Sequence, residues 1–387
     1  MRAYVSWLSA AGIFSVCFSL PAFAQSADFN ILGGTEGGAY YAMAHDISRL
    51  YEKYCGKKLN VLPSNGSFDN VTQMDSRRPA TLGFVHSDTL DYLTIDAKAK
   101  GEMCKEACRK ARSNVKDLRY VFPVYAAEVH LLAHRNSGIT SIEDLRGKRV
   151  SLGPDGSGTQ KTALTLLSTS SSPIRVVEGD ETDPRRFTKM LPKEQLSALS
   201  EGKIDAFFWV TGQPVEPLTA RDGKCSERLK DISLVTLSIP LKLRNVYNKA
   251  TTEYPCITPE EIDTFSVSSI LVTYNFTENN GYMLQRCKDV AVISHLIWKH
   301  LKELQTEEND YHGNWKGLTE ENIFKAEVEG WGKNACVSKY ETLPFQEELV
   351  EALRPNSVEG KCIFDEYCLQ FKQGASVRQL CEIERTH

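Results

Sequence analysis

Residues 29–41 read FNILGGTEGGAYY and contain the pattern that decides the fold: a short apolar strand, a glycine-rich turn and the start of a helix. The helix is predicted by apolar residues at helical spacing, namely Met43, Ile47, Leu50 and Tyr51. A turn of this kind exposes backbone N–H groups at the positive end of the following helix, which suits a small anion such as a carboxylate.

Three more segments repeat this arrangement of strand, turn and helix. Leu59–Pro63 leads through a serine- and glycine-containing turn to a helix with Ser67 as its predicted N-cap, and Thr81–Val85 leads into the turn HSD. Val150–Leu152 leads into the glycine-rich turn 153–159. Alternating strands and helices predict an α/β fold, in which ligands collect at such strand ends. The alternative is ordinary loop chemistry, since Gly and Ser occur in many turns.

The composition is typical of a folded soluble chain. The 387 residues predict two or three domains, and 41% hydrophobic with 25% charged residues is ordinary for a globular protein. The net charge of −4 argues against a general nucleic-acid-binding function, which requires a basic surface. Past the N-terminus, no apolar stretch is long enough to predict a membrane-spanning helix.

Residues 1–24 have the layout of a secretory signal peptide. Arg2 supplies the positive start, Leu8–Leu20 is the apolar run, and Pro21–Ala24 offers a small-x-small cleavage site. We therefore expect the mature chain to be a soluble protein of the bacterial periplasm. A membrane anchor is the alternative, although the apolar run is short for a span.

Ten cysteines follow this leader, and an even number in an exported chain predicts disulfides. Cys225 with Cys256 is the expected local pair, and further pairing is expected within Cys336–Cys381. Zinc binding is the alternative, but the closely spaced cysteines lack the C-x-x-C spacing and nearby histidines. The disulfide candidates are Cys55, Cys104, Cys108, Cys225, Cys256, Cys287, Cys336, Cys362, Cys368 and Cys381.

The segment GGTEGGAYY at 33–41 resembles the opening of the TAXI solute receptors, the periplasmic binding subunits of one branch of the TRAP transporters. Four further segments resemble motifs of that family in the same order: NGSFDN at 65–70, GFVHSD at 83–88, the run 141–158 and GKIDAFFWVTGQP at 202–214. Glu36 and His86 depart from the family pattern, which usually has a small residue and a glutamine at these positions. The resemblance covers about residues 29–345.

The resemblance implies a type II periplasmic-binding-protein fold: two α/β lobes joined by a hinge, with a ligand cleft between them. It also implies an extracytoplasmic solute-binding receptor that captures a small organic acid and delivers it to TRAP-type membrane permease subunits. Residues 96–114 and about 306–318 are additions to the family pattern. The chain order places lobe one at 28–122 and 275–349, lobe two at 123–274, and a Cys-containing C-terminal extension, packed on lobe one, at 350–387.

The expected ligand is a dicarboxylate or an amino-acid-like carboxylate, such as 2-oxoglutarate or glutamate, held by backbone amides and hydroxyl groups at helix starts in both lobes. The scheme requires no cofactor and no metal. We expect Tyr40 to face the cleft and Tyr41 the core, and we expect Trp209 in the core. The candidate ligand-binding residues are Gly37, Gly38, Tyr40, Asn65, Ser67, His86, Ser87, Ser157, Gly158, Thr159 and Gln213.

The sequence does not predict an enzyme. The turn at 33–38 is neither G-x-G-x-x-G nor a P-loop, the segment around Ser157 is not a G-x-S-x-G elbow, and H-E-x-x-H does not occur. The alternative function is a periplasmic partner-binding or sensory protein that reuses the fold without transport, with residues 350–387 as its contact segment. We expect a monomer.

Overall fold

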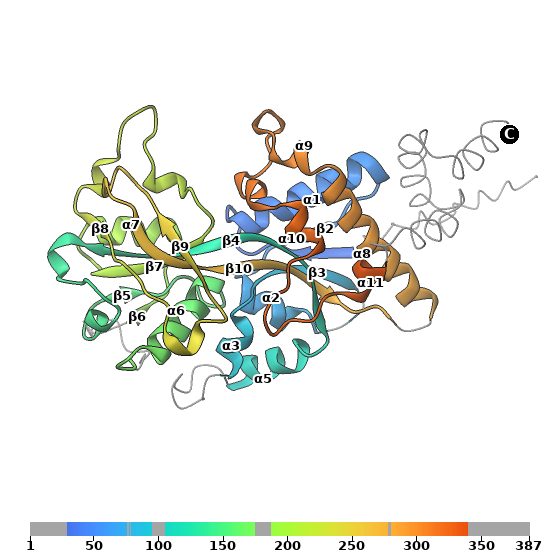
Figure 1. The fold of residues 1–387 in the computed structure, drawn as a ribbon, viewed down its shortest axis with the longest axis horizontal. Helices are drawn as coiled ribbons and strands as arrows, with labels where there is room; N and C mark the ends of the chain where they lie inside the picture. Colours follow the sequence, from blue (N-terminus) through green and yellow to red (C-terminus); the bar gives the residue numbers. More distant parts are fainter. Residues whose placement is uncertain are drawn as a thin grey trace, which may run out of the picture.

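The computed structural model describes residues 29–75, 77, 79–94, 105–174, 187–277 and 280–339. These residues form two α/β halves that lie side by side and share one ten-stranded sheet (Figure 1). The predicted signal peptide and the predicted extension 350–387 lie outside the described residues, as do Cys104, Cys362, Cys368 and Cys381.

Lobe one, as we use the name below, is built around the parallel strands β1, β2 and β3, with β1 between the other two. The apolar side chains that predicted helix α1 are buried there, so that helix covers the sheet as expected. The elements of lobe one are β1 (Phe29–Leu32), α1 (Ala39–Cys55), β2 (Asn60–Leu62), α2 (Ser67–Gln73), β3 (Ala80–His86), α3 (Thr89–Thr94), α5 (Lys105–Asn114), α8 (Gly281–Lys299), α9 (Leu301–Gln305), α10 (Glu320–Phe324) and α11 (Ala335–Lys339), with 3-10 turns at Glu307–Asn309 and Gly313–Gly317.

Lobe two extends the same sheet with β7, β5 and β6, which run parallel to one another. Helix α6 packs against β7, and α7 lies on the same strand. The elements of lobe two are β5 (Val150–Ser151), α6 (Gly158–Thr169), β6 (Phe187–Thr188), α7 (Pro192–Ser200), β7 (Ala206–Thr211), β8 (Ile232–Leu234) and β9 (Asn248–Thr252), with 3-10 turns at Arg135–Ser137, Glu143–Leu145, Glu216–Leu218, Glu227–Leu229 and Leu241–Leu243.

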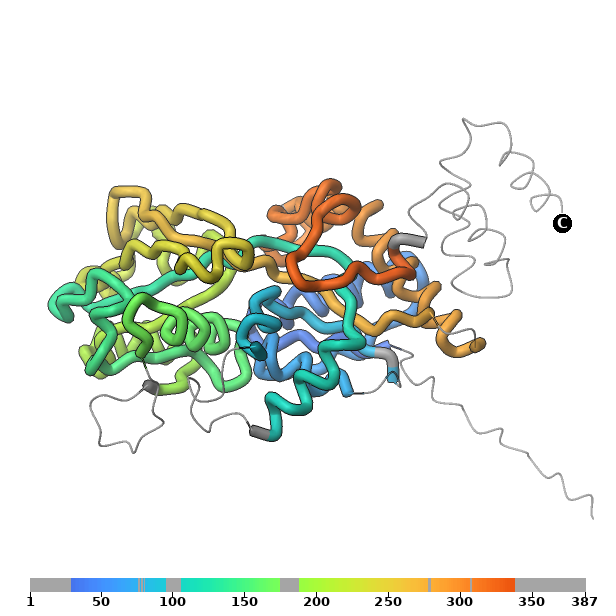
Figure 2. The backbone as a smooth tube through the Cα atoms, turned by 60° about the horizontal axis from the view of Figure 1, so that its bottom comes forward, coloured from blue at the N-terminus to red at the C-terminus, as the bar shows by residue number. Residues whose placement is uncertain are grey.

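Two long antiparallel strands, β4 (Leu118–His134) and β10 (Ile262–Tyr274), run through both lobes and form the hinge. They lie in the middle of the strand order β2-β1-β3-β10-β4-β7-β5-β6, and a second view shows the chain passing between the halves along them (Figure 2). The sequence predicts two separate strands in the β4 region, Tyr120–Tyr125 and Val129–His134, but the ladder continues through Ala126–Glu128, which pair with Ser266–Ser268. The predicted fold class, two α/β lobes joined by a hinge, is confirmed.

Two local predictions need correction. The sequence predicts one long helix over about residues 281–304, but the segment forms two helices, α8 and α9, because the backbone leaves helical geometry at His300. The predicted N-cap Ser67 is the first residue of α2, and Gly66 is the N-cap. Gly66 has a φ of 113°, and a side chain on it would lie 3.3 Å from the Cα of Ser157, so glycine is required there.

The disulfides confirm one expected pair and correct another. Cys225 is bonded to Cys256 as predicted, but Cys287 is bonded to Cys336, so the expected pairing of Cys336 within 336–381 is wrong. The reason is tertiary: α8 packs on α11 and brings together two cysteines that are 49 residues apart. Cys55 and Cys108 are also disulfide-bonded, which counts against zinc binding, and no three metal-ligating side chains gather within the described residues.

Candidate functional site

A hollow of about 120 Å³ lies between the two lobes at the carboxyl ends of the central strands. Both lobes contribute to its wall through the glycine- and serine-rich turns that the sequence singled out. The lining residues are Gly33, Gly34, Thr35, Gly38, Ala39, Tyr40, Asn65, Gly66, His86, Tyr125, Pro154, Ser157, Gly158, Thr159, Pro192, Trp209, Val210 and Thr211. The ionisable side chains among these described lining residues are those of His86, Tyr40 and Tyr125.

Tyr40, at the start of α1, lies in the lobe-one wall of the hollow. Its ring stacks on Phe84 with 5.1 Å between ring centroids, and its hydroxyl accepts a hydrogen bond of 3.0 Å from Ser269 Oγ. Burial raises the pKa of Tyr40 well above its usual value, so the hydroxyl stays protonated. Because the hydroxyl accepts from Ser269, it can donate its own hydrogen to a ligand. Tyr41 instead packs edge-on against His45.

His86 ends strand β3 and closes the floor of the hollow. The side chain is 3% exposed, and this burial lowers its pKa to about 4, so the imidazole is neutral at neutral pH. A neutral ring binds a carboxylate only as a single hydrogen-bond donor and not as a cation.

The lobe-two wall begins at the N-terminus of α6. Ser157 caps this helix, because its Oγ accepts a hydrogen bond of 3.1 Å from Gln160 N. The Thr159 hydroxyl accepts from Val210 N at 3.2 Å. Gly158 lies directly against lobe one: a side chain there would approach Ser67 Oγ to 2.6 Å and collide with the His86 ring. The Ser157 and Thr159 hydroxyls are thus both engaged by backbone N–H groups next to the hollow.

The two lobes touch along one edge of the hollow. The Gly156 carbonyl of lobe two accepts hydrogen bonds from Phe68 N at 3.1 Å and Asp69 N at 3.2 Å, in the first turn of α2. The sequence predicts anion binding at the N-terminus of this helix. The amides of Phe68 and Asp69, however, are already hydrogen-bonded to the Gly156 carbonyl. The structure is therefore a closed conformation, in which lobe one lines the hollow mainly with the α1 turn, the turn before α2 and the end of β3.

Four predicted ligand residues do not line the hollow. Gly37 lies in the turn before α1, and Ser67 is fully buried with its Oγ accepting from His86 N at 3.0 Å. The carbonyl of Ser87 accepts from Trp331 Nε1 at 2.8 Å. Gln213 donates to the carbonyl of Thr251 at 2.8 Å. The positions of these residues indicate support of the hollow rather than direct contact with its contents.

Among the lining residues that were not predicted as site residues, two are aromatic, Trp209 and Tyr125. Trp209 was expected in the core because it alternates with Phe207, but it is half-buried and lies at the carboxyl end of β7, where the strand leaves the core. Tyr125 comes from hinge strand β4. The sequence could have predicted this position for Trp209, because it lies near the end of a strand, where ligands collect in α/β sheets. It offers no such indication for Tyr125, which lies within the long strand β4.

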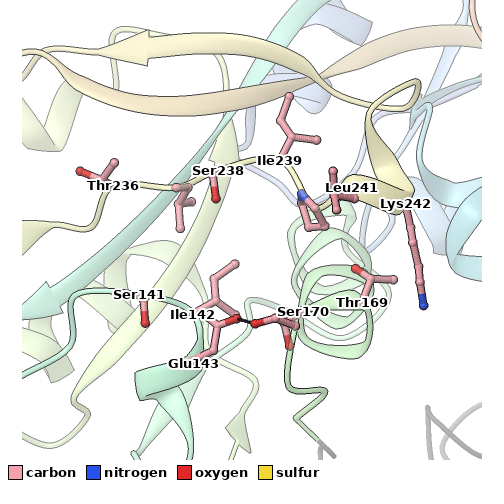
Figure 3. Close-up of a pocket in the computed structure, with 13 residues that line it drawn as sticks. Ser141, Ile142, Glu143, Thr169, Ser170, Thr236, Ser238, Ile239, Leu241 and Lys242 are labelled. Atoms are coloured by element: carbon pink, nitrogen blue, oxygen red, sulfur yellow. Dashed lines mark hydrogen bonds between the residues drawn. The ribbon is translucent and has the colours of Figure 1, made fainter.

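A larger hollow of about 460 Å³ lies on lobe two alone (Figure 3). Two of its serine side chains are engaged by their own neighbours: Ser171 donates to Glu143 at 2.5 Å, and Ser141 donates to Asp144 at 3.0 Å. The opposite wall is largely apolar and includes Ile239 and the exposed Leu241. Since this hollow lies within lobe two and does not bridge the lobes, the interlobe hollow is the better candidate site.

The described residues thus form two hinged α/β lobes with a hollow closed between them. Residues 31–310, well over half of the chain, match the model of the NMT1-like family, and the chain belongs to that family. No helix among the described residues is long and apolar enough to cross a membrane.

Similar solved structures are binding proteins by name. One is the periplasmic aliphatic sulphonate binding protein SsuA from Escherichia coli, at 17% identity over 73% of this chain and 77% of that chain, with a TM-score of 0.37. A second is the alkanesulfonate-binding protein SsuA from Xanthomonas axonopodis pv. citri bound to MOPS, at 15% identity over 76% and 82%, with a TM-score of 0.38. A third is a binding protein component of an ABC phosphonate transporter from Pseudomonas aeruginosa, at 11% identity over 84% and 96%, with a TM-score of 0.36.

Proposed function

We propose that the protein is an exported, non-enzymatic solute receptor that captures a small organic acid in the interlobe hollow and delivers it to a membrane transporter. The observation that carries this proposal is that turns from both lobes meet in one hollow. A ligand there contacts both lobes at once, so it binds the closed state better than any open state and shifts the hinge equilibrium toward closure.

The size and chemistry of the hollow support a compact, mono- or dicarboxylate ligand. Its volume of about 120 Å³ is below the 300–1,000 Å³ that is usual for drug-sized ligands. Tyrosine and serine hydroxyls and the backbone of the glycine-rich turns line it, and no lysine or arginine is among the described lining residues. We therefore propose that hydrogen-bond donors, rather than a salt bridge, hold an acid such as 2-oxoglutarate or glutamate.

The partner and the compartment belong to the same proposal. The motifs at 33–41 and 83–88 favour a TRAP-type permease as the receiving transporter. The described disulfides, Cys225–Cys256 and Cys287–Cys336, favour an oxidising compartment such as the periplasm.

Two neighbouring tyrosines allow a matched test of the site. Tyr40→Phe removes a hydroxyl that faces the hollow and keeps the ring stacked on Phe84, whereas Tyr41→Phe removes a hydroxyl that packs elsewhere. Thermal shift and calorimetry with a panel of carboxylates should find a ligand for the wild-type protein. We expect Tyr40→Phe to weaken its binding about tenfold and Tyr41→Phe to leave it unchanged. Equal affinity in both variants contradicts the assignment of the site.

A further inference from the structure

Asp88, which follows strand β3 in lobe one, is bonded to two hydroxyl groups of lobe two. Its Oδ2 accepts from Thr162 Oγ1 at 2.7 Å and from Tyr247 OH at 2.7 Å. The Asp88 side chain is fully buried, and its Oδ1 has no hydrogen-bond partner among the described residues. None of these three residues lines the ligand hollow, so this contact between the lobes is separate from the ligand site.

A second contact lies beside the first. Lys161, next to Thr162 on α6, is 5% exposed, and its ammonium lies 4.4 Å from the ring centroid of Phe68 and 4.9 Å from that of Tyr92. Both rings belong to lobe one, and the ammonium also donates to Gln160 Oε1 at 2.7 Å. Helix α6 therefore contacts lobe one in two ways. The Lys161 ammonium lies against two lobe-one aromatic rings, and the Thr162 hydroxyl donates to the Asp88 carboxylate. Helix α6 packs on α3 at this junction (Figure 1).

We propose that Asp88, Thr162 and Tyr247 form a latch that holds the two lobes closed in the absence of ligand. The latch goes beyond the proposed function, because it makes no use of the hollow or its contents. Strands β4 and β10 are the two connections that run through both lobes, so a hinge motion about them separates Asp88 from both hydroxyl groups.

The chemistry explains why such a latch is adjustable. Closure removes the Asp88 carboxylate from water, which costs free energy, and two hydroxyl donors offset that cost. If one donor is removed, a buried acceptor loses its partner, and the closed state becomes less favourable than an open state in which water solvates Asp88. The latch thus sets the ratio of closed to open protein before any ligand binds.

The test uses the full exported chain after exhaustive dialysis, with native mass spectrometry showing that no small molecule remains. The variants are Thr162→Val and Tyr247→Phe, singly and together, because both keep the side-chain shape. Thr165→Val is the matched control: it lies one turn further along α6, it is fully buried, and its hydroxyl has no hydrogen-bond partner among the described residues. Circular dichroism and thermal unfolding confirm that each variant is folded.

Two readouts report closure without any ligand. Small-angle scattering gives the radius of gyration, and hydrogen exchange reports the amides of Phe68 and Asp69, whose acceptor is Gly156 O in the other lobe. We expect the double variant to have a larger radius and about tenfold faster exchange at 67–70, with Thr165→Val unchanged. If the double variant unfolds, the single variants provide the same comparison. Wild-type radius and exchange in folded Thr162→Val and Tyr247→Phe overturn the latch, whether or not a carboxylate ligand is ever found.

Discussion

The carbonyl of Gly156 in lobe two accepts a hydrogen bond of 3.1 Å from the backbone N–H of Phe68 in lobe one. The first turn of α2 is thus completed by the opposite lobe, since the N–H groups at a helix start have no partner within their own helix. A ligand that binds at this junction has to do so in a closed protein, and opening the hinge has to expose these amides to water.

Gly158→Ala tests whether closure depends on close backbone contact. A Cβ at position 158 would lie 2.6 Å from Ser67 Oγ, which no real contact allows. Since Gly158 does not have a positive φ, the substitution acts by this collision and not by backbone strain. We expect small-angle scattering to show a more open protein with normal thermal stability of the lobes. Gly281→Ala, at a helix start with open space around it, is the control, and equal scattering of the two variants contradicts the prediction.

Closure is also expected to depend on pH through Asp88. Burial raises the pKa of Asp88 to about 6, against a usual value of 3.8 that it regains when the lobes open. The closed state therefore binds the proton more tightly, so it gains stability as pH falls from about 6 toward 3.8 and loses that stability as pH rises through about 6.

The variant Asp88→Asn identifies the source of that pH dependence. Asp88 interacts electrostatically with Asp91 on α3, Tyr247 and Tyr40. Glu128 on the hinge strand β4 titrates in the same pH range, because burial raises its pKa to about 7. Hydrogen exchange of residues 67–70 between pH 5 and 8, corrected for intrinsic exchange rates, should lose most of its pH dependence in Asp88→Asn. A profile identical to the wild-type profile would instead assign the effect to Glu128.

The Cys287–Cys336 disulfide is expected to stabilise lobe one rather than closure. It links α8 to α11 across 49 residues, so its removal frees a long loop in the unfolded state. We expect Cys287→Ala/Cys336→Ala to lower the free energy of unfolding by about 2–4 kcal/mol, measured by denaturant titration. The scattering profile and the pH dependence of hydrogen exchange in α2 should remain as in the wild type. A change in either would show that the disulfide also controls the hinge.

Trp209 should report ligand binding optically. The side chain is half-buried and lines the hollow, so a ligand that closes the cleft changes its surroundings. We expect the fluorescence change on adding a binding carboxylate to disappear in Trp209→Phe, while Trp315→Phe, a change in a fully buried residue of lobe one, keeps it. An undiminished change in Trp209→Phe would place the ligand elsewhere.

Local patterns predicted the strands, the first helix and the turns that reach the hollow, because periodicity and turn chemistry depend on neighbours in the sequence. Tyr40 lines the hollow because it begins a helix directly after a glycine-rich turn, a position that the local pattern contains. Gly38, Asn65, His86, Ser157, Gly158 and Thr159 also line the hollow as expected.

The remaining features depend on tertiary contacts that no local pattern contains. Asp88 is 74 residues from Thr162 and 159 from Tyr247, so the latch between them leaves no trace in the spacing of the sequence. The pairing of Cys287 with Cys336 likewise follows from helix packing. Ser67 and Ser87 were predicted as ligand donors from their residue type, but their surroundings in the fold bury them.

Native mass spectrometry of the protein purified from the periplasm is the most direct test of the central claim, that the interlobe hollow binds a small organic acid. We predict a bound mass that corresponds to one small carboxylic acid per monomer, which exchanges with added 2-oxoglutarate or glutamate and is lost in Tyr40→Phe. A protein that carries no small molecule and binds no carboxylate at millimolar concentration would contradict the account.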